Sequence, residues 1–190
     1  MELFRKIKSA IRRFRLIQNP EKWPGYVHDN LVGYLILKKI NYLENKNTHY
    51  IQTGFNISES RKIDLDYFVE GPTYFYRGVI MEGIPEERMR DAMVMSAHLN
   101  NKLRTSQVYV NPDHRVIFAI VRIDMPTCVL YPGTMFDLLG AHFDECVLSL
   151  EAFEKLFNSD DDPIFIIADL IDKMNSKTSK GSNDHNSNEK

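Results

Sequence analysis

The residues best suited to chemistry are a histidine and a cysteine four positions apart, His142 and Cys146. Four residues is close to one helical turn, so both side chains share a face if this segment is helical. A zinc site needs two further ligands, and no Cys-x-x-Cys or His-x-x-x-His spacing supplies them. A nucleophilic thiol needs a neighbouring base and a lowered pKa, which no pattern here indicates for Cys146 or for Cys128. We therefore expect a packed cysteine beside a half-exposed histidine.

Two other clusters carry side chains that could take part in catalysis or ligand binding. Four carboxylates, Glu82, Glu86, Glu87 and Asp91, gather where a helix is predicted to begin. They can exchange protons, but they also complement a helix dipole, which is the interpretation we favour. The run Tyr74–Arg77 can stack on single-stranded nucleic acid, or it can form the core and surface of one strand, which we favour. No phosphate-binding loop, Gly-x-Gly-x-x-Gly, nucleophile elbow or zinc-protease motif occurs, which removes the common enzyme classes but does not exclude an enzyme of another class. With no catalytic signature in the sequence, we expect a non-enzymatic protein without a cofactor.

The charge is unevenly distributed along the chain. Residues 1–22 hold seven Lys and Arg against two acidic residues, whereas the remainder holds 17 basic and 24 acidic residues. An acidic body argues against nucleic acid as a partner of the core domain. Two cysteines fit a reducing compartment, and neither a signal peptide nor an apolar run of about 20 residues is recognisable. We therefore expect a cytoplasmic protein, soluble or peripheral to a membrane.

The N-terminal segment, residues 3–17, has the pattern of a basic amphipathic helix. Its apolar residues recur at spacings of three and four: Leu3, Ile7, Ala10, Phe14 and Ile17. Basic residues occupy much of the rest: Arg5, Lys6, Lys8, Arg12, Arg13 and Arg15. Such a helix can lie on an anionic membrane or in a partner's groove, or it can pack on its own domain. Both interpretations stay open, because Pro and Gly at positions 20, 24 and 25 predict a kinked linker.

The rest of the chain predicts an α+β fold with the element order α-βββ-α-ββ-α. Strands are expected at Thr48–Ile57, Lys62–Val69, Thr73–Met81, Ser106–Asn111 and Arg115–Asp124. Helices are expected at Leu31–Leu43, Ile84–Thr105 and Tyr131–Phe157, with a short one at Ile164–Met174. Short polar, Gly and Pro connections between strands favour hairpins, and therefore an antiparallel sheet with helices packed on it.

The domain organisation follows from these elements. Residues 1–25 form the basic helix and linker, 26–158 the α+β domain, 159–174 a C-terminal helix, and 175–190 a polar tail. The tail has no large apolar residue, and its composition predicts disorder.

Two segments have more apolar residues than one buried face needs. Val116–Val121 is apolar throughout, which predicts a strand covered on both faces, by helices on one and by a subunit or partner on the other. In the helix Ile84–Thr105, an inward stripe is expected at Met89, Met93 (with Ala92), Ser96, Leu99 and Leu103. Val94 and Met95 then widen the apolar surface beyond that stripe and make it a candidate contact surface.

The element order and several local stretches resemble the YbjN-type domain, which shares the fold of type III secretion chaperones. The similarity covers Asp29–Phe157, about two-thirds of the chain. It is carried by five stretches: Glu82–Glu87, His98–Asn100, Val108–Val110, Val116–Phe118 and Leu150–Phe157. The pattern consists of apolar positions together with Asn100, without a catalytic signature. This chain departs from it in the basic N-terminal helix, the helix after Pro163 and the polar tail.

The resemblance implies an α+β domain, commonly dimeric, that binds protein segments rather than catalysing a reaction. Secretion chaperones of this fold wrap an extended part of a client on apolar patches, and YbjN-type proteins are linked to sensory or stress regulation. The resemblance transfers no functional residue.

Our first hypothesis is a protein-binding or regulatory domain, a homodimer in the cytoplasm, that buries partner segments on apolar surface. The candidate contact residues are Phe68, Val94, Met95, Ile117 and Val121. The second is a peripheral membrane adaptor that uses residues 3–17. The third is an enzyme of an unrecognised class, which would require groups such as His98 and His142 to converge in a pocket.

Overall fold

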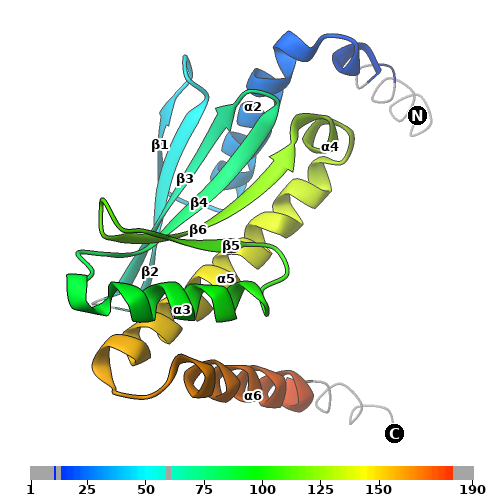
Figure 1. The fold of residues 1–190 in the computed structure, drawn as a ribbon. Helices are drawn as coiled ribbons and strands as arrows, with labels where there is room; N and C mark the ends of the chain where they lie inside the picture. The colour runs from blue at the N-terminus through cyan, green and yellow to red at the C-terminus, as the bar shows by residue number, and fades with distance from the viewer. Residues whose placement is uncertain (1–10, 12–13, 59–60, 182–190) are drawn as a thin grey trace, which may run out of the picture.

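The computed structural model describes Ile11, residues 14–58 and residues 61–181, except for the side chains of 173–181. Its centre is one antiparallel sheet of six strands in the order β1-β2-β3-β4-β6-β5 (Figure 1). The strands are β1 (Tyr42–Asn45), β2 (Tyr50–Ser58), β3 (Arg61–Glu70), β4 (Thr73–Glu82), β5 (Gln107–Asn111) and β6 (Val116–Asp124). The predicted α+β class and antiparallel sheet are confirmed, and the five predicted strands lie close to their expected bounds.

The helices pack together on one side of this sheet. They are α2 (Trp23–Leu37), α3 (Met89–Asn100), α4 (Met125–Leu130), α5 (Pro132–Asn158) and α6 (Pro163–Gly181). Two 3-10 turns, η1 (Pro20–Lys22) and η2 (Glu86–Arg88), lead into α2 and α3. The predicted helix Tyr131–Phe157 is confirmed as α5, which Pro132 opens in its first turn.

The first helix of the domain begins and ends earlier than predicted. The sequence predicts that Pro24 and Gly25 break a helix, but both lie in the first turn of α2. Proline is tolerated there, because the backbone N–H that it lacks would have no partner within the helix. The helix ends at Leu37, and a positive φ of 57° at Lys39 then turns the chain into β1. The expected helix over Leu31–Leu43 therefore runs too far, because its last residues begin a strand.

The helix after β4 is shorter than predicted and is rotated about its axis. The buried stripe of α3 consists of Ala92, Met95 and Leu99, whereas the side chain of Met93 is 43% exposed. The expected inward position of Met93 is therefore wrong, whereas those of Ala92 and Leu99 are confirmed.

The C-terminal helix is longer than predicted. Helix α6 continues to Gly181, so residues 175–181 are helical and not disordered, while 182–190 lie outside the described residues. The helix is held by three buried aliphatic residues, Ile166, Ile167 and Leu170, and it packs on α3 and α5.

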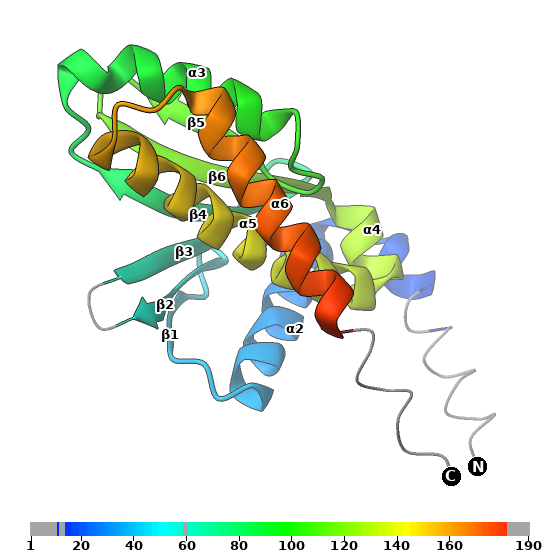
Figure 2. The ribbon, with the colours of Figure 1, turned by 90° about the horizontal axis from the view of Figure 1, so that it is seen from below.

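The sheet has one covered face and one open face. Figures 1 and 2 show α2, α4 and α5 on the same side of the strands. The side chains on that side form the core and alternate along each strand, as period-two geometry requires. They include Ile63, Leu65, Tyr67, Tyr74, Tyr76, Ile117, Ala119 and Val121. Helix α5 lies close against β4 at Gly78, where an added Cβ would overlap the sulfur of Cys146.

Candidate functional site: the open face of the sheet

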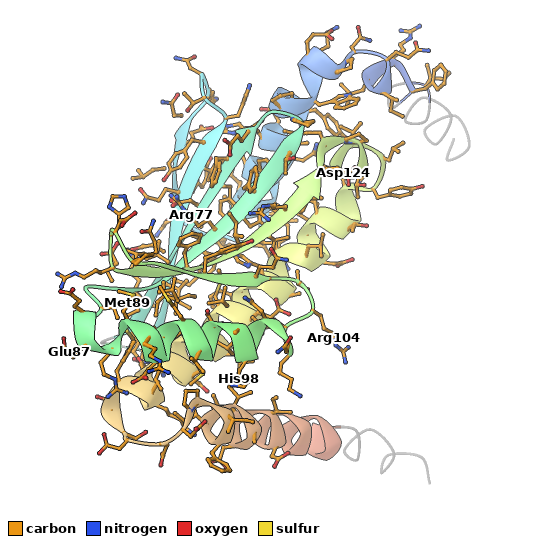
Figure 3. The ribbon with its side chains drawn as sticks, viewed as in Figure 1. Arg77, Glu87, Met89, His98, Arg104 and Asp124 are labelled. Atoms are coloured by element: carbon orange, nitrogen blue, oxygen red, sulfur yellow. The ribbon has the colours of Figure 1, made fainter. Side chains whose placement is uncertain are left out.

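The open face carries a row of aromatic rings and arginines that none of the described helices covers. It draws on four strands, and its members are Phe68 on β3, Phe75 and Arg77 on β4, Tyr109 on β5, and Phe118 and Arg122 on β6. We call these six residues the aromatic–arginine row. They share one face because the register aligns Phe68 with Phe75, Phe75 with Arg122, and Tyr109 with Phe118. Figure 3 shows Arg77 over the middle of the strands.

The rings of this row stand parallel in two stacked pairs. The centroids of Phe68 and Phe75 are 5.1 Å apart with planes inclined by 8°, and those of Tyr109 and Phe118 are 5.5 Å apart at 20°. All four side chains are half-buried. Cross-strand aromatic pairs of this kind stabilise a sheet by about 0.2–1 kcal/mol each. Because the rings cover one another's faces, they present mainly their edges to a binding partner.

Arg77 is fixed within the row by a carboxylate. Its guanidinium carbon lies 5.4 Å from the ring centroid of Phe68, and its Nε and Nη2 donate to Asp66 Oδ2 at 3.1 and 2.5 Å. The hydroxyl of Tyr50 donates to the other oxygen of Asp66 at 2.5 Å. Burial, with the hydrogen bond to Asp66 next in size, raises the pKa of Tyr50 to about 12. Asp66, only 4% exposed, is therefore satisfied by both neighbours.

Arg122 lies in the same row, and none of the described carboxylates is paired with it. Its guanidinium carbon is 5.9 Å from the ring centroid of Phe75 and 5.6 Å from that of Tyr109. Its polar contact among the described residues is Gln107 Oε1 at 3.4 Å, an oxygen that also accepts the Tyr109 hydroxyl at 2.6 Å. The other strand cations of this face are paired, Arg77 with Asp66 and Lys62 with Asp64. Arg122 thus differs from them in having donors to spare.

The edges of the sheet are less open than its face. At the β5 edge, the side-chain amide of Asn100 donates to the carbonyl of Val108 at 2.9 Å and accepts from its N–H at 2.7 Å. Asn100 thereby occupies the backbone groups of Val108, in the middle of the edge that another strand would pair with. The opposite edge, β1, has only four residues. The face is therefore the larger uncovered element of this sheet.

The residues first considered for chemistry lie in the core. His142 and Cys146 share one face of α5, as predicted, with Cys146 Sγ 3.6 Å from His142 Nε2. His142 is not half-exposed, because its side chain is fully buried and its Nδ1 lies 2.8 Å from Ser106 Oγ. Burial lowers the pKa of His142 to about 4 and raises the pKa of the Cys146 thiol far above its usual range. Burial likewise raises the pKa of Cys128 to about 12. These shifts disfavour a thiolate.

The remaining chemical candidates do not meet. His98 lies on α3 and lines a cavity of about 500 Å³ against α6 (Figure 3), whereas His142 lies in the core, and no described contact joins them. In the acidic cluster before α3, Asp91 is bound to Arg88 at 3.1 Å. Across the part of the chain that is described, three or more His, Cys, Asp or Glu side chains do not gather as a metal would require.

The five residues predicted as a contact surface are divided by the structure. Phe68 is half-buried in the aromatic–arginine row, and Val94 is 41% exposed on α3. Met95 and Ile117 have no exposed surface and Val121 has 4%, so the expectation that these three lie at the surface is wrong. Met95 faces inward with Ala92 and Leu99 at helical spacing. Ile117 and Val121 have the strand parity of the covered face.

Sequence reasoning missed Tyr109, Phe118 and Arg122, although a signal was present. In β6, Val116, Phe118, Ile120 and Arg122 share one parity, and an arginine at the end of that series marks its face as the wetter one. The helices cover one face of β6, as predicted, and the cover predicted for its other face, by a subunit or partner, stays a prediction.

Most of the predicted basic N-terminal helix lies outside the described residues. Arg5, Lys6, Lys8, Arg12 and Arg13 lie outside the described residues, whereas Arg15 is exposed. Of the predicted apolar stripe, Phe14 is 62% exposed and Ile17 packs partly against the core. The neighbouring Ile11 is 49% exposed. None of the helices in the described part of the chain is long and apolar enough to cross a bilayer.

Comparison with protein-family models finds no match, and comparison with curated proteins finds none either. Among solved structures, the crystal structure of YbjN from E. coli, a proposed transcription regulator, matches with a TM-score of 0.49 at 15% sequence identity. The match covers 67% of this chain and 91% of YbjN. The roles of residues in this chain follow from its own contacts.

Proposed function

We propose that this protein is a non-enzymatic binding domain that holds a segment of a partner protein on the open face of its sheet, in the manner of a secretion chaperone or regulator. The observation that carries the proposal is the aromatic–arginine row. Its six side chains stand on a sheet face without a helix, and half-buried aromatic rings with arginine are typical of protein interfaces.

Two properties of the face favour protein over nucleic acid. Base stacking needs a free ring face, but Arg77 lies over Phe68 and Arg122 over Phe75, while the two rings cover each other. The same face also carries carboxylates on β3 and β6, which repel a phosphate backbone: Asp64, Glu70 and Asp124.

Site-specific crosslinking in cells of the source organism tests the proposal. A photoreactive phenylalanine derivative replaces Phe118 on the open face or, as a control, Leu37, which is 77% exposed at the end of α2. We expect discrete adducts with other proteins from position 118, weaker adducts from position 37, and loss of the former when Phe75→Ser is added. Equal patterns from both positions would refute the proposal.

Self-association is a separate part of the proposal. We expect a homodimer, measured by sedimentation equilibrium of the full chain, whose contact leaves the open face available. An adduct from position 118 at twice the mass of the chain would show that the face joins two copies, and would overturn the binding of client segments.

A second candidate function, a peripheral membrane adaptor, is favoured by the exposed apolar residues Ile11 and Phe14. Apolar side chains beside many cations can enter an anionic bilayer surface. Flotation with vesicles of phosphatidylglycerol and phosphatidylcholine tests this function. Binding is expected to fall at least tenfold when both residues are replaced by serine, and unchanged flotation of that variant would exclude the idea.

A further inference from the structure

We infer that Arg122 anchors a carboxylate of the bound segment, so that the open face selects an acidic residue flanked by apolar ones. This inference rests on the proposed function and specifies the class of partner. It is based on the contacts that orient Arg122, on the ion pair between Arg77 and Asp66, and on the residues next to Arg122 on the open face.

Neighbouring rings orient the guanidinium of Arg122, but most of its N–H donors have no partner among the described residues. Contacts with the rings of Phe75 and Tyr109 restrict the side chain, so less rotamer freedom is lost when a ligand binds. A guanidinium has five N–H donors in its plane, and only a 3.4 Å contact to Gln107 occupies one of them among the described residues. Carboxylates match this planar fork in a bidentate way.

Arg77 makes an arginine–carboxylate interaction within the chain, with two of its N–H groups on one oxygen of Asp66. It also lies over a ring of the row, that of Phe68, and its Nε and Nη2 both donate to Asp66. The register places Asp66 directly opposite Arg77, whereas the residue opposite Arg122 is Phe75. The carboxylate that Arg77 receives from the next strand is therefore missing at Arg122, and a partner segment can supply it.

The surroundings of Arg122 define the rest of the bound segment. Asp124 is two residues further along β6, but its carboxylate accepts bonds from the N–H and hydroxyl of Thr127 and caps α4. These bonds lower the pKa of Asp124. In the other direction lie Ile120 and Phe118, so apolar side chains fit beside the carboxylate. A polyanion is disfavoured because Asp124 and Glu70 remain close to its path.

Two pools of synthetic dodecapeptides test the inference. Both contain Leu, Ile, Phe and Tyr at degenerate flanking positions; one has Asp or Glu at the centre, and the other has the isosteric Asn or Gln. Binding of each fluorescent pool to the full-length chain is measured by polarisation at 50 and 300 mM salt. We expect the acidic pool to bind at least tenfold more tightly at low salt, with a smaller ratio at high salt.

Matched variants assign the effect to one residue. Arg122→Gln should bring the acidic pool to the level of the amide pool, and Arg122→Lys should retain part of the difference, because it keeps the charge but not the fork. Arg104→Gln, which removes the same charge from the exposed α3–β5 loop (Figure 3), should change nothing. Circular dichroism checks that each variant is folded.

The outcomes separate this inference from the proposed function. If both pools bind equally and Phe75→Ser abolishes both, the inference fails while the proposed function stands. If neither pool binds, or if Phe75→Ser leaves binding unchanged, both the inference and the proposed function fail. If a dT12 oligonucleotide displaces the acidic pool at equal concentration, the face binds phosphate groups, and the inference is overturned.

Discussion

Protonation of His142 should make the stability of this fold depend on pH in a window set by burial. The imidazole is fully buried beside Ser106, and burial lowers its pKa from 6.5 to about 4. Between these two values, the unfolded chain binds a proton at this position and the folded chain does not. The contribution of His142 to the free energy of unfolding is therefore present above pH 6.5 and is lost as the pH falls toward 4.

The magnitude follows from the two pKa values. A lowering from 6.5 to about 4 corresponds to about 3 kcal/mol in total, at about 1.4 kcal/mol for a tenfold change in proton affinity. About 2 kcal/mol of this is lost between pH 7 and pH 5. That interval lies above most of the titration of ordinary carboxylates, and comparison with a His142 variant separates this histidine from the others in the chain.

Urea unfolding of the wild type and of His142→Gln at pH 7 and 5 measures the effect. The wild type should lose about 2 kcal/mol more than the variant over this interval. Any pH-independent cost of the substitution cancels in the comparison. His114→Gln, in the exposed β5–β6 turn, serves as the control and should behave as wild type. The reasoning is refuted if His142→Gln keeps the full pH dependence, or if NMR shows the His142 ring protonating near pH 6.5.

Three further substitutions test how the scaffold is held. Gly78→Ala should lower the free energy of unfolding by about 1–3 kcal/mol in a urea titration, because its Cβ overlaps the Cys146 sulfur; adding Cys146→Ala should recover part of the loss, and strict additivity would contradict this account. Glu145→Gln should cost about 1–2 kcal/mol in the same titration, because the carboxylate accepts three N–H groups of the loop before β5, at 2.6 to 3.0 Å. Asn100→Ala should expose the β5 edge and increase self-association in light scattering, whereas an unchanged particle size would show that the edge needs no cover.

Strands were easier to predict than helices in this chain, for local reasons. Alternation in Lys62–Val69 and the Gly-Pro pair that follows it specify a strand and a turn within a few residues. The strand β1 has only four residues, Tyr42–Asn45, and its leucine also fits the helical spacing of the segment before it. Its extended conformation depends on pairing with β2, which is a contact along the sheet rather than a local preference.

The rotation of α3 shows where a periodic pattern becomes ambiguous. The predicted stripe centres on Met89 and Met93, and a second possible stripe centres on Met95; both include Ala92 and Leu99. Both stripes have helical spacing, so hydrophobicity alone does not choose between them. Packing against β5, α5 and α6 places the second stripe inward and leaves Val94 exposed.

The sequence by itself determined the class of the fold, because hydrophobic periods of two and of 3.6 residues are local properties of the chain. It also separated the basic N-terminal segment from the acidic body. The tertiary structure decided which face of the sheet the helices cover, and therefore that Phe118 and Arg122 are accessible while Ile117 and Val121 are buried. It also decided that Arg77 meets Asp66 while Arg122, within the described part of the chain, meets rings and Gln107, since pairing across strands depends on register.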